Sequence, residues 1–183
     1  MNLPASFEGR ERVRLFCALR LPEPALDTLS EWQGGQLVGG RVVPRDHLHV
    51  TLAFLGHRPA EELAPIAEAL REAAAAAEPI HFLSERYRET RSVGMLVLKD
   101  LAGTATGLAA DLFGRLEQAR VYEREARPWL PHVTVLRFRR PPRLKPLLPD
   151  LGELMPSDAA VFLSRLRPSG AEYVVVESFA LGG

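Results

Sequence analysis

His49-Val50-Thr51-Leu52-Ala53-Phe54 and His132-Val133-Thr134-Val135-Leu136-Arg137 are two copies of one pattern, and their histidines lie 83 residues apart. Both copies contain β-branched residues, which favour strands. Successive side chains of a strand point to opposite faces, so each copy places its histidine and threonine on one face and aliphatic residues on the other. The repeat therefore predicts two similar strands that anchor to a core and present two imidazoles and two hydroxyls to a shared cleft.

These four side chains are suited to opening a cyclic phosphate. Imidazole has an ordinary pKa of about 6.5, so it can give or take a proton at neutral pH. In-line attack of water places the nucleophile and the leaving oxygen on opposite sides of phosphorus, so one histidine would act as base and the other as acid. Thr51 and Thr134 would donate hydrogen bonds to the non-bridging oxygens. Neither step requires a metal ion or another cofactor, and we expect none.

The sequence around the repeat predicts an α+β fold with antiparallel sheets. Strands and helices mix without a regular βαβ rhythm, and the chain ends in a hairpin around residues 168–170. A glycine-rich stretch, residues 34–40, lacks the pattern of a nucleotide-binding loop and is interpreted as a mobile loop that ends the first helix. We expect strands at 12–20, 48–55, 80–88, 93–99, 130–138, 159–167 and 173–181, and helices from Pro22, at 60–77 and at 101–120.

Length and composition are typical of one globular domain. The chain has 183 residues, 46% hydrophobic and 25% charged. No apolar run is long enough to cross a bilayer, and the first residues lack a secretory pattern, so we expect a cytoplasmic protein with no membrane association. No obligate protein partner is inferred. Cys17 is the only cysteine, which excludes an intramolecular disulfide or a zinc site built on several cysteines, and its apolar surroundings predict a buried core residue.

Positive charge is concentrated in one segment, although the formal net charge of the chain is zero. Residues 121–146 contain six arginines and one lysine but only two acidic residues. Arginine presents a planar fork that fits phosphate. The segment therefore fits either phosphate recognition or an ordinary solvated face, and a non-catalytic RNA-binding protein that uses Arg139, Arg140 and Arg143 is an alternative function.

Three other residues near the repeat have competing interpretations. His47 shares the strand parity of His49 and could form a metal pair with it, completed by His57 or His132, but no acidic residue lies at ligand spacing. We place His47 at the rim of the cleft and expect no metal site. Phe54 and Arg137 both follow five residues after their histidine, so strand parity turns both away from the cleft, and we expect Phe54 in the core.

The same residues resemble a known family, the 2H phosphoesterases, and within it the LigT-like or ThpR-like RNA 2′,3′-cyclic phosphodiesterases, also called 2′-5′ RNA ligases. The resemblance extends over nearly the whole chain. It is carried by Arg14-Leu15-Phe16-Cys17-Ala18-Leu19, by the first copy from Val43-Pro44 to Gly56, by the second copy from Arg127-Pro128 to Arg137, and by residues 173–181.

This resemblance implies a fold and a set of roles. The fold would be a single domain over residues 1–183, with two intertwined lobes related by a pseudo-twofold axis and a cleft between them. His49 would be the proton donor, His132 the proton acceptor, and Arg137 would lie near the substrate beside Thr51 and Thr134. The implied reaction is hydrolysis of an RNA 2′,3′-cyclic phosphate end, or of a small cyclic nucleotide, to a 2′-phosphomonoester. Ligation through a 2′-5′ bond in the same site is the alternative.

Overall fold

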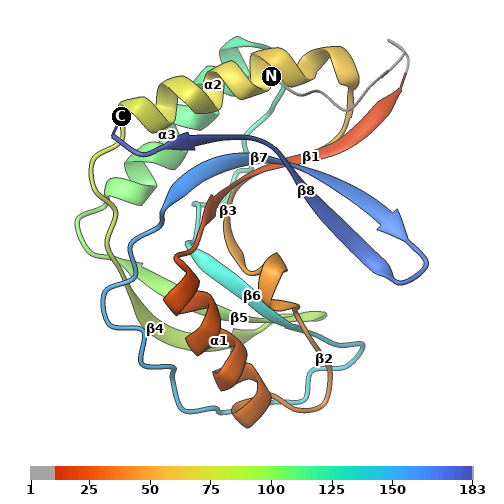
Figure 1. Ribbon diagram of the computed structural model, residues 1–183, viewed down its shortest axis with the longest axis vertical. Coiled ribbons are helices and arrows are strands. Elements are labelled where there is room, and N and C mark those ends of the chain that lie inside the picture. Colours follow the sequence, from red (N-terminus) through yellow and green to blue (C-terminus); the bar gives the residue numbers. More distant parts are fainter. Residues whose placement is uncertain (1–10, 183) are drawn as a thin grey trace.

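One antiparallel sheet of eight strands organises the protein. A computed structural model describes residues 11–182 and gives the strand order β4-β5-β6-β3-β1-β7-β8, with the short β2 paired to β6 (Figure 1). The strands are β1 (Arg12–Arg20), β2 (Arg41–Val42), β3 (His49–Pro59), β4 (Phe82–Glu89), β5 (Val93–Asp100), β6 (His132–Arg137), β7 (Asp158–Arg167) and β8 (Gly170–Ala180). The helices are α1 (Glu23–Gln36), α2 (Leu63–Ala75) and α3 (Thr104–Gln118), with short 3-10 turns at Arg45–His47 and Ala60–Glu62. The predicted α+β class with antiparallel pairing is confirmed.

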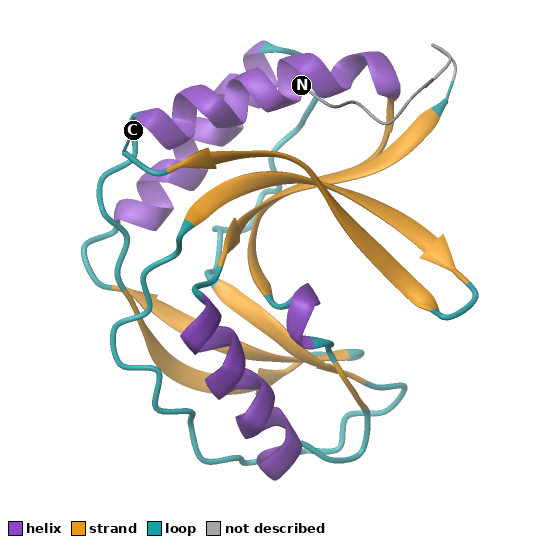
Figure 2. Ribbon diagram, viewed as in Figure 1, coloured by secondary structure: helices purple, strands orange, loops and turns teal. Residues whose placement is uncertain are grey.

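The strands form two groups, and the helices cover them from outside. In Figure 2, β1, β3, β7 and β8 lie with α2 and α3 in the upper part, whereas β4, β5 and β6 lie with α1 in the lower part. Helix α1 follows β1 in sequence but packs in the lower part, and α3 follows β5 but packs against α2, so the chain passes repeatedly between the two parts. The expected single domain of two intertwined lobes stays a prediction.

Strand β1 lies inside the sheet, between β3 and β7, and both of its faces are apolar. Leu15, Cys17 and Leu19 point into the main core under the helices, and Phe16 and Ala18 point to the other side. All five residues are at most 3% exposed. A strand that is buried on both faces carries a continuous apolar run rather than an alternating one.

Glycines end fewer elements than the sequence suggests. Gly34 and Gly35 lie inside α1, which continues to Gln36, so the prediction that they break the helix is wrong. Each costs about 1 kcal/mol of helix propensity, but both lie on the exposed side of a helix held by its buried face. Gly56 does not end β3 either: it takes φ +68° where the register with β1 shifts, and the strand continues to Pro59. There the glycine marks a β-bulge.

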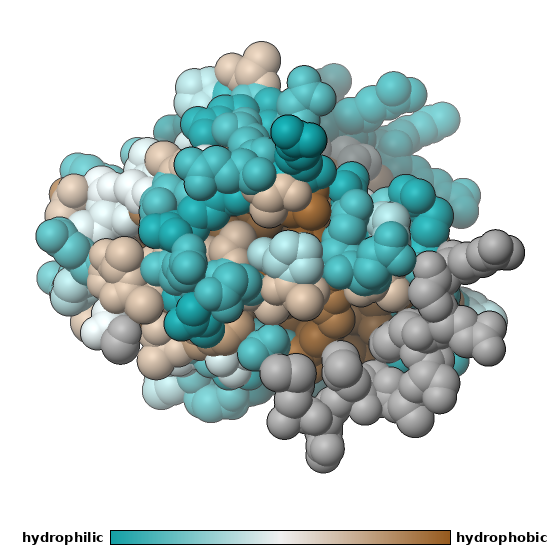
Figure 3. All heavy atoms as spheres, turned by 90° about the horizontal axis from the view of Figure 1, so that it is seen from above, coloured by the Kyte–Doolittle hydropathy of each residue, from teal (hydrophilic) through white to brown (hydrophobic). Residues whose placement is uncertain are grey.

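Seen from above, over the helical side, the surface is a mixture of hydrophilic and weakly hydrophobic side chains with a few strongly apolar residues between them (Figure 3). Among the described residues, no helix is long and apolar enough to span a bilayer. The cytoplasmic location expected from the sequence stays a prediction.

Candidate active site

The two copies of the repeat are adjacent antiparallel strands at the centre of the sheet. Val50 of β3 pairs with Val133 of β6. This register places His49 across from Thr134 and Thr51 across from His132, all on the face opposite the buried valines. All four side chains are half-buried. The structure therefore brings the four predicted residues onto one polar surface, with the copies in opposite directions as a twofold relation requires.

A matching β-bulge follows each threonine and changes the orientation of the rest of the copy. In β3 the partner of Ala18 is Thr51 but that of Cys17 is Ala53, so Leu52 is the extra residue. In β6 the partners of Met95 and Gly94 are Thr134 and Leu136, so Val135 is extra. The burial pattern of both copies is the same, with two consecutive buried residues at the bulge and an exposed residue after them.

These bulges overturn the expectation that Phe54 and Arg137 point away from the cleft. One extra residue reverses the alternation of faces. Phe54 therefore pairs with Phe16 and is 49% exposed, so its prediction as a core residue is wrong. Arg137 is exposed and shares the face of Thr134, because their partners Val93 and Met95 share a face of the regular strand β5. Simple strand parity therefore misplaces this arginine, and its contact with substrate, which the resemblance implies, stays a prediction.

Backbone carbonyls fix the tautomer of both histidines. Nδ1 of His49 lies 2.7 Å from the carbonyl oxygen of His47, and Nδ1 of His132 lies 2.8 Å from that of Leu130. A carbonyl oxygen can only accept, so each neutral ring carries its proton on Nδ1 and leaves Nε2 as the reactive nitrogen. Nε2 of His49 is 3.0 Å from Oγ1 of Thr51, whose hydroxyl donates to it in this state. The two imidazoles thus present equivalent nitrogens.

An aromatic wall, formed by Phe16, Phe162 and Tyr173, covers one side of His49. The Phe16 ring stacks on His49 with centroids 5.0 Å apart, and Phe162 stacks on Phe16 at 4.9 Å. Tyr173 of β8 contacts His49 edge-on at 5.8 Å and stacks on His47 at 4.4 Å. His47 is half-buried, and its assignment to the rim of the cleft stays a prediction. The doubly apolar run of β1 is the one sequence signal that could have indicated this wall.

Burial and positive charge together lower the pKa of His49 to about 4. Desolvation against the aromatic wall is the largest cause, and the charges of His132, His47 and Arg137 act in the same direction, partly opposed by the hydrogen bond to the His47 carbonyl. Burial, aided by Arg137 and opposed by Asp46, also lowers the pKa of His47. The charges that lower this pKa are all positive, and such a surrounding favours an anionic ligand.

Two hydrogen-bonding side chains that the sequence did not reveal hold the two strands in place. Gln33 of α1 is 2% exposed, and its Nε2 donates to the carbonyls of Val43 and of the bulge residue Val135, at 3.0 and 2.8 Å. The indole nitrogen of Trp129 donates to the carbonyl of Thr51 at 3.0 Å. The only sequence signal that could have indicated the role of Gln33 is its position next to the apolar face of a helix.

The remaining residues singled out from the sequence lie away from this centre. Cys17 is fully buried, and burial raises the pKa of its thiol to about 12. His81 lies 2.8 Å from Glu153, and His57 is exposed at the far end of β3. In the basic segment, Arg124 and Arg127 pair with Glu117 and Glu125, whereas Arg139, Arg140 and Arg143 have no carboxylate within ion-pair distance among residues 11–182.

The metal-site hypothesis finds no geometric support in the part of the chain that the structure describes. Within that part, no three His, Cys, Asp or Glu side chains are grouped so as to hold a metal ion. His49 is instead bound to Thr51 and to a carbonyl, and His47 stacks on Tyr173. That the reaction needs no cofactor stays a prediction.

Comparison with known proteins places this fold in an established class. Residues 19–88 match the model of the LigT-like phosphoesterases. The chain is also 33% identical to a Thermus thermophilus protein over 93% of its own length and 91% of that protein's length. The chain belongs to the LigT-like phosphoesterase family. That Thermus relative is an RNA 2′,3′-cyclic phosphodiesterase.

Solved structures agree with this assignment. The crystal structure of the protein TT0787 from Thermus thermophilus superposes with a TM-score of 0.78 at 32% identity, covering 93% of this chain and 98% of that one. Escherichia coli LigT complexed with 3′-AMP gives a TM-score of 0.81 at 24% identity, covering 94% and 100% of the two chains. At that identity the second likeness shows the fold alone.

Proposed function

We propose that the protein is an RNA 2′,3′-cyclic phosphodiesterase that produces a 2′-phosphomonoester. The observation that carries this proposal is the antiparallel pair of His-x-Thr strands, which places two imidazoles with the same tautomer on one face of the sheet. A non-catalytic binding site would have no need for two Nε2 atoms so presented. The relative of the same family that is an RNA 2′,3′-cyclic phosphodiesterase supports the substrate class.

In the proposed mechanism the two histidines act in opposite senses. His132 takes a proton from water through Nε2 as the oxygen attacks phosphorus. The bond from phosphorus to the 3′ oxygen breaks on the opposite side, and His49 protonates that oxygen through its own Nε2. The 2′ oxygen keeps the phosphate. Solvent then returns His132 and His49 to their starting states.

Substrate binding lets His49 take up from solvent the proton that it later donates. The free protein holds His49 neutral, because its pKa is about 4. A bound phosphate brings negative charge to the same cleft, and a nearby opposite charge raises the pKa of an imidazole. The hydroxyl of Thr51 then turns from Nε2 of His49 to a phosphate oxygen. Thr134 and Arg137 complete the set that holds the non-bridging oxygens.

The test is turnover of a short RNA ending in a 2′,3′-cyclic phosphate, in the presence of EDTA, with the phosphate position of the product assigned by ³¹P NMR. His49→Ala and His132→Ala should each lower kcat by about 10²- to 10⁴-fold. His81→Ala removes a histidine at a distant surface pair and should keep wild-type turnover. Wild-type turnover by either cleft variant would refute the mechanism, and a 3′-phosphate product would refute the assignment of the leaving oxygen.

A further inference from the structure

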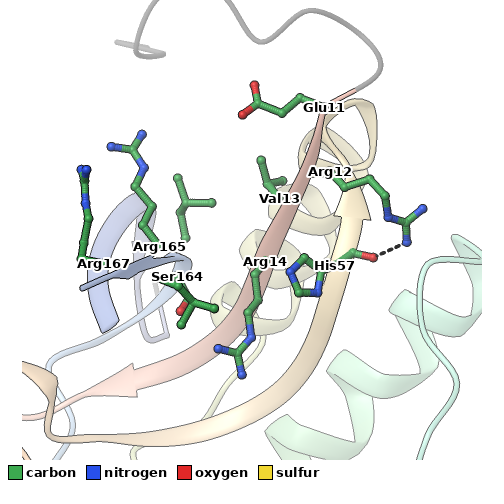
Figure 4. Close-up of a pocket in the computed structure, with 10 residues that line it drawn as sticks. Glu11, Arg12, Val13, Arg14, His57, Ser164, Arg165 and Arg167 are labelled. Carbon is green, nitrogen blue, oxygen red and sulfur yellow. Dashed lines mark hydrogen bonds between the residues drawn. The ribbon is translucent and has the colours of Figure 1, made fainter. Parts of the chain in front are cut away.

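A polar pocket lies where the sheet divides, near the start of β1. His49 lies at the other end of β1, where its partner is Arg20. The pairing of β1 with β7 ends at Arg14 and Ser164. Beyond that pair β1 continues alongside β3 while β7 continues alongside β8, and the two strand pairs separate. The pocket between them has a volume of about 510 Å³. Figure 4 shows Glu11, Arg12 and Arg14 on the β1 side and Arg165 and Arg167 on the β7 side.

This fork pocket, lined by Arg12, Arg14, Arg165 and Arg167, carries excess positive charge. Glu11 is the one acidic residue among its described lining residues, and Arg167 also pairs with Glu172 outside it. Arg14 and Arg165 have no carboxylate within ion-pair distance in the described part of the chain. Of the four arginines, Arg12 donates to the carbonyl oxygen of His57 on the side away from β7 (Figure 4), and Arg167 pairs with Glu172, so Arg14 and Arg165 are the charges most available to an anion.

The wall of the fork pocket also holds a hydrogen-bonding group without a partner. Ser164 is 6% exposed, and its Oγ makes no hydrogen bond within residues 11–182. Buried hydroxyls are normally paired, because an unpaired one costs free energy. Ser164 is the partner of Arg14 across β7 and β1, so an unpaired hydroxyl lies beside a guanidinium in this wall.

Arg14 joins the fork pocket to the catalytic cleft. It lies two residues from Phe16 on the same face of β1, and its guanidinium stands 4.9 Å from the centroid of the Phe54 ring. Phe54 is exposed and lies between Thr51 and the fork pocket along β3. Aromatic and guanidinium planes stack on unpaired bases, and arginines bind the backbone between them. Polar and aromatic groups therefore continue from the cleft into the pocket.

We propose that the fork pocket binds the phosphodiester backbone of the RNA strand upstream of its cyclic phosphate end, with Phe54 and Arg14 contacting a base on the way. This inference rests on the proposed function and specifies its substrate as an oligonucleotide rather than a cyclic mononucleotide. The fork pocket supplies binding energy only, and the chemistry stays with His49 and His132.

The dimensions of the sheet fit a short single strand. Ala18 pairs with Thr51, and the distance along β1 from Ala18 to Arg14 and Arg12 is about 13 and 20 Å at about 3.3 Å per residue. A stacked nucleic-acid strand advances about 3.4 Å per nucleotide. Roughly four to six nucleotides would therefore extend from the cleft to the arginines, so a hexamer reaches the pocket and a mononucleotide does not.

The experiment compares a hexaribonucleotide ending in a 2′,3′-cyclic phosphate with adenosine 2′,3′-cyclic monophosphate. In Arg165→Gln/Arg167→Gln, KM for the hexamer should rise about tenfold, because two solvent-exposed ion pairs with phosphate are lost. Turnover of the mononucleotide should be unchanged. The slope of log affinity against log salt for the hexamer should fall by about 1.4, since each single-strand phosphate contact contributes about 0.7.

A matched control removes the same amount of positive charge from the helices α2 and α3, away from the fork pocket. Arg71→Gln/Arg115→Gln takes two arginines from surface ion pairs on α2 and α3 and should leave both substrates unaffected. Equal effects of the pocket variant on both substrates, or no effect on the hexamer, would overturn the proposal.

Fluorescence anisotropy with a hexamer ending in a 3′-phosphate measures pocket binding without catalysis. If wild type binds this RNA in a manner dependent on Arg165 and Arg167 yet hydrolyses neither substrate, the proposed function fails while the pocket assignment stands.

Discussion

Replacing His49 with asparagine should remove a pH dependence from the stability of the fold. The pKa of His49 is about 4 in the folded protein and about 6.5 in the unfolded chain. Between these values the unfolded chain binds a proton that the folded protein does not, so the free energy of unfolding falls as the pH is lowered. The size of this contribution is about 2 kcal/mol between pH 8 and pH 5. His49→Asn, which keeps a donor toward the His47 carbonyl, should lose it.

Urea unfolding at half-unit steps from pH 8 to pH 5 measures this contribution, because carboxylates titrate mostly below that range. The wild-type curve should fall by about 2 kcal/mol more than that of His49→Asn. His57→Asn removes an exposed histidine and serves as the control. Its free energy of unfolding should fall more steeply with decreasing pH than that of His49→Asn. Equal slopes for wild type and His49→Asn, or an NMR titration of the His49 ring near pH 6.5, would refute the argument that burial holds this imidazole neutral.

Two further predictions concern groups behind the cleft. Gln33→Leu should lower the free energy of unfolding by about 1–3 kcal/mol, because the carbonyls of Val43 and Val135 lose the buried donor from α1. A melting temperature within error of wild type would contradict that role. The thiol of Cys17 should react with a chromogenic disulfide reagent only after unfolding in urea, since the residue is 0% exposed and burial raises its pKa to about 12. Rapid labelling of the native protein would show instead that β1 opens readily.

Local sequence patterns determined the centre of this protein. The repeat of histidine and threonine at two-residue spacing predicted the strands, the shared face and the residues that meet there, because side-chain alternation within a short regular strand is a property of the backbone alone. The apolar run of β1 and the spacing of helices and strands were similarly sufficient for the α+β class. The alternation within each copy does not depend on which strands become neighbours, whereas the meeting of the two copies requires the pairing of β3 with β6.

Tertiary structure decided what strand parity could not. The bulges at Leu52 and Val135 turn Phe54 and Arg137 toward the cleft, and an extra residue in a strand is visible only against the register of its partner. The aromatic wall and the lowered pKa of His49 likewise depend on β7 and β8, more than 100 residues away in sequence. Burial depends on the sum of such distant contacts, so the repeat alone identified the two histidines as a pair, and packing made their environments differ.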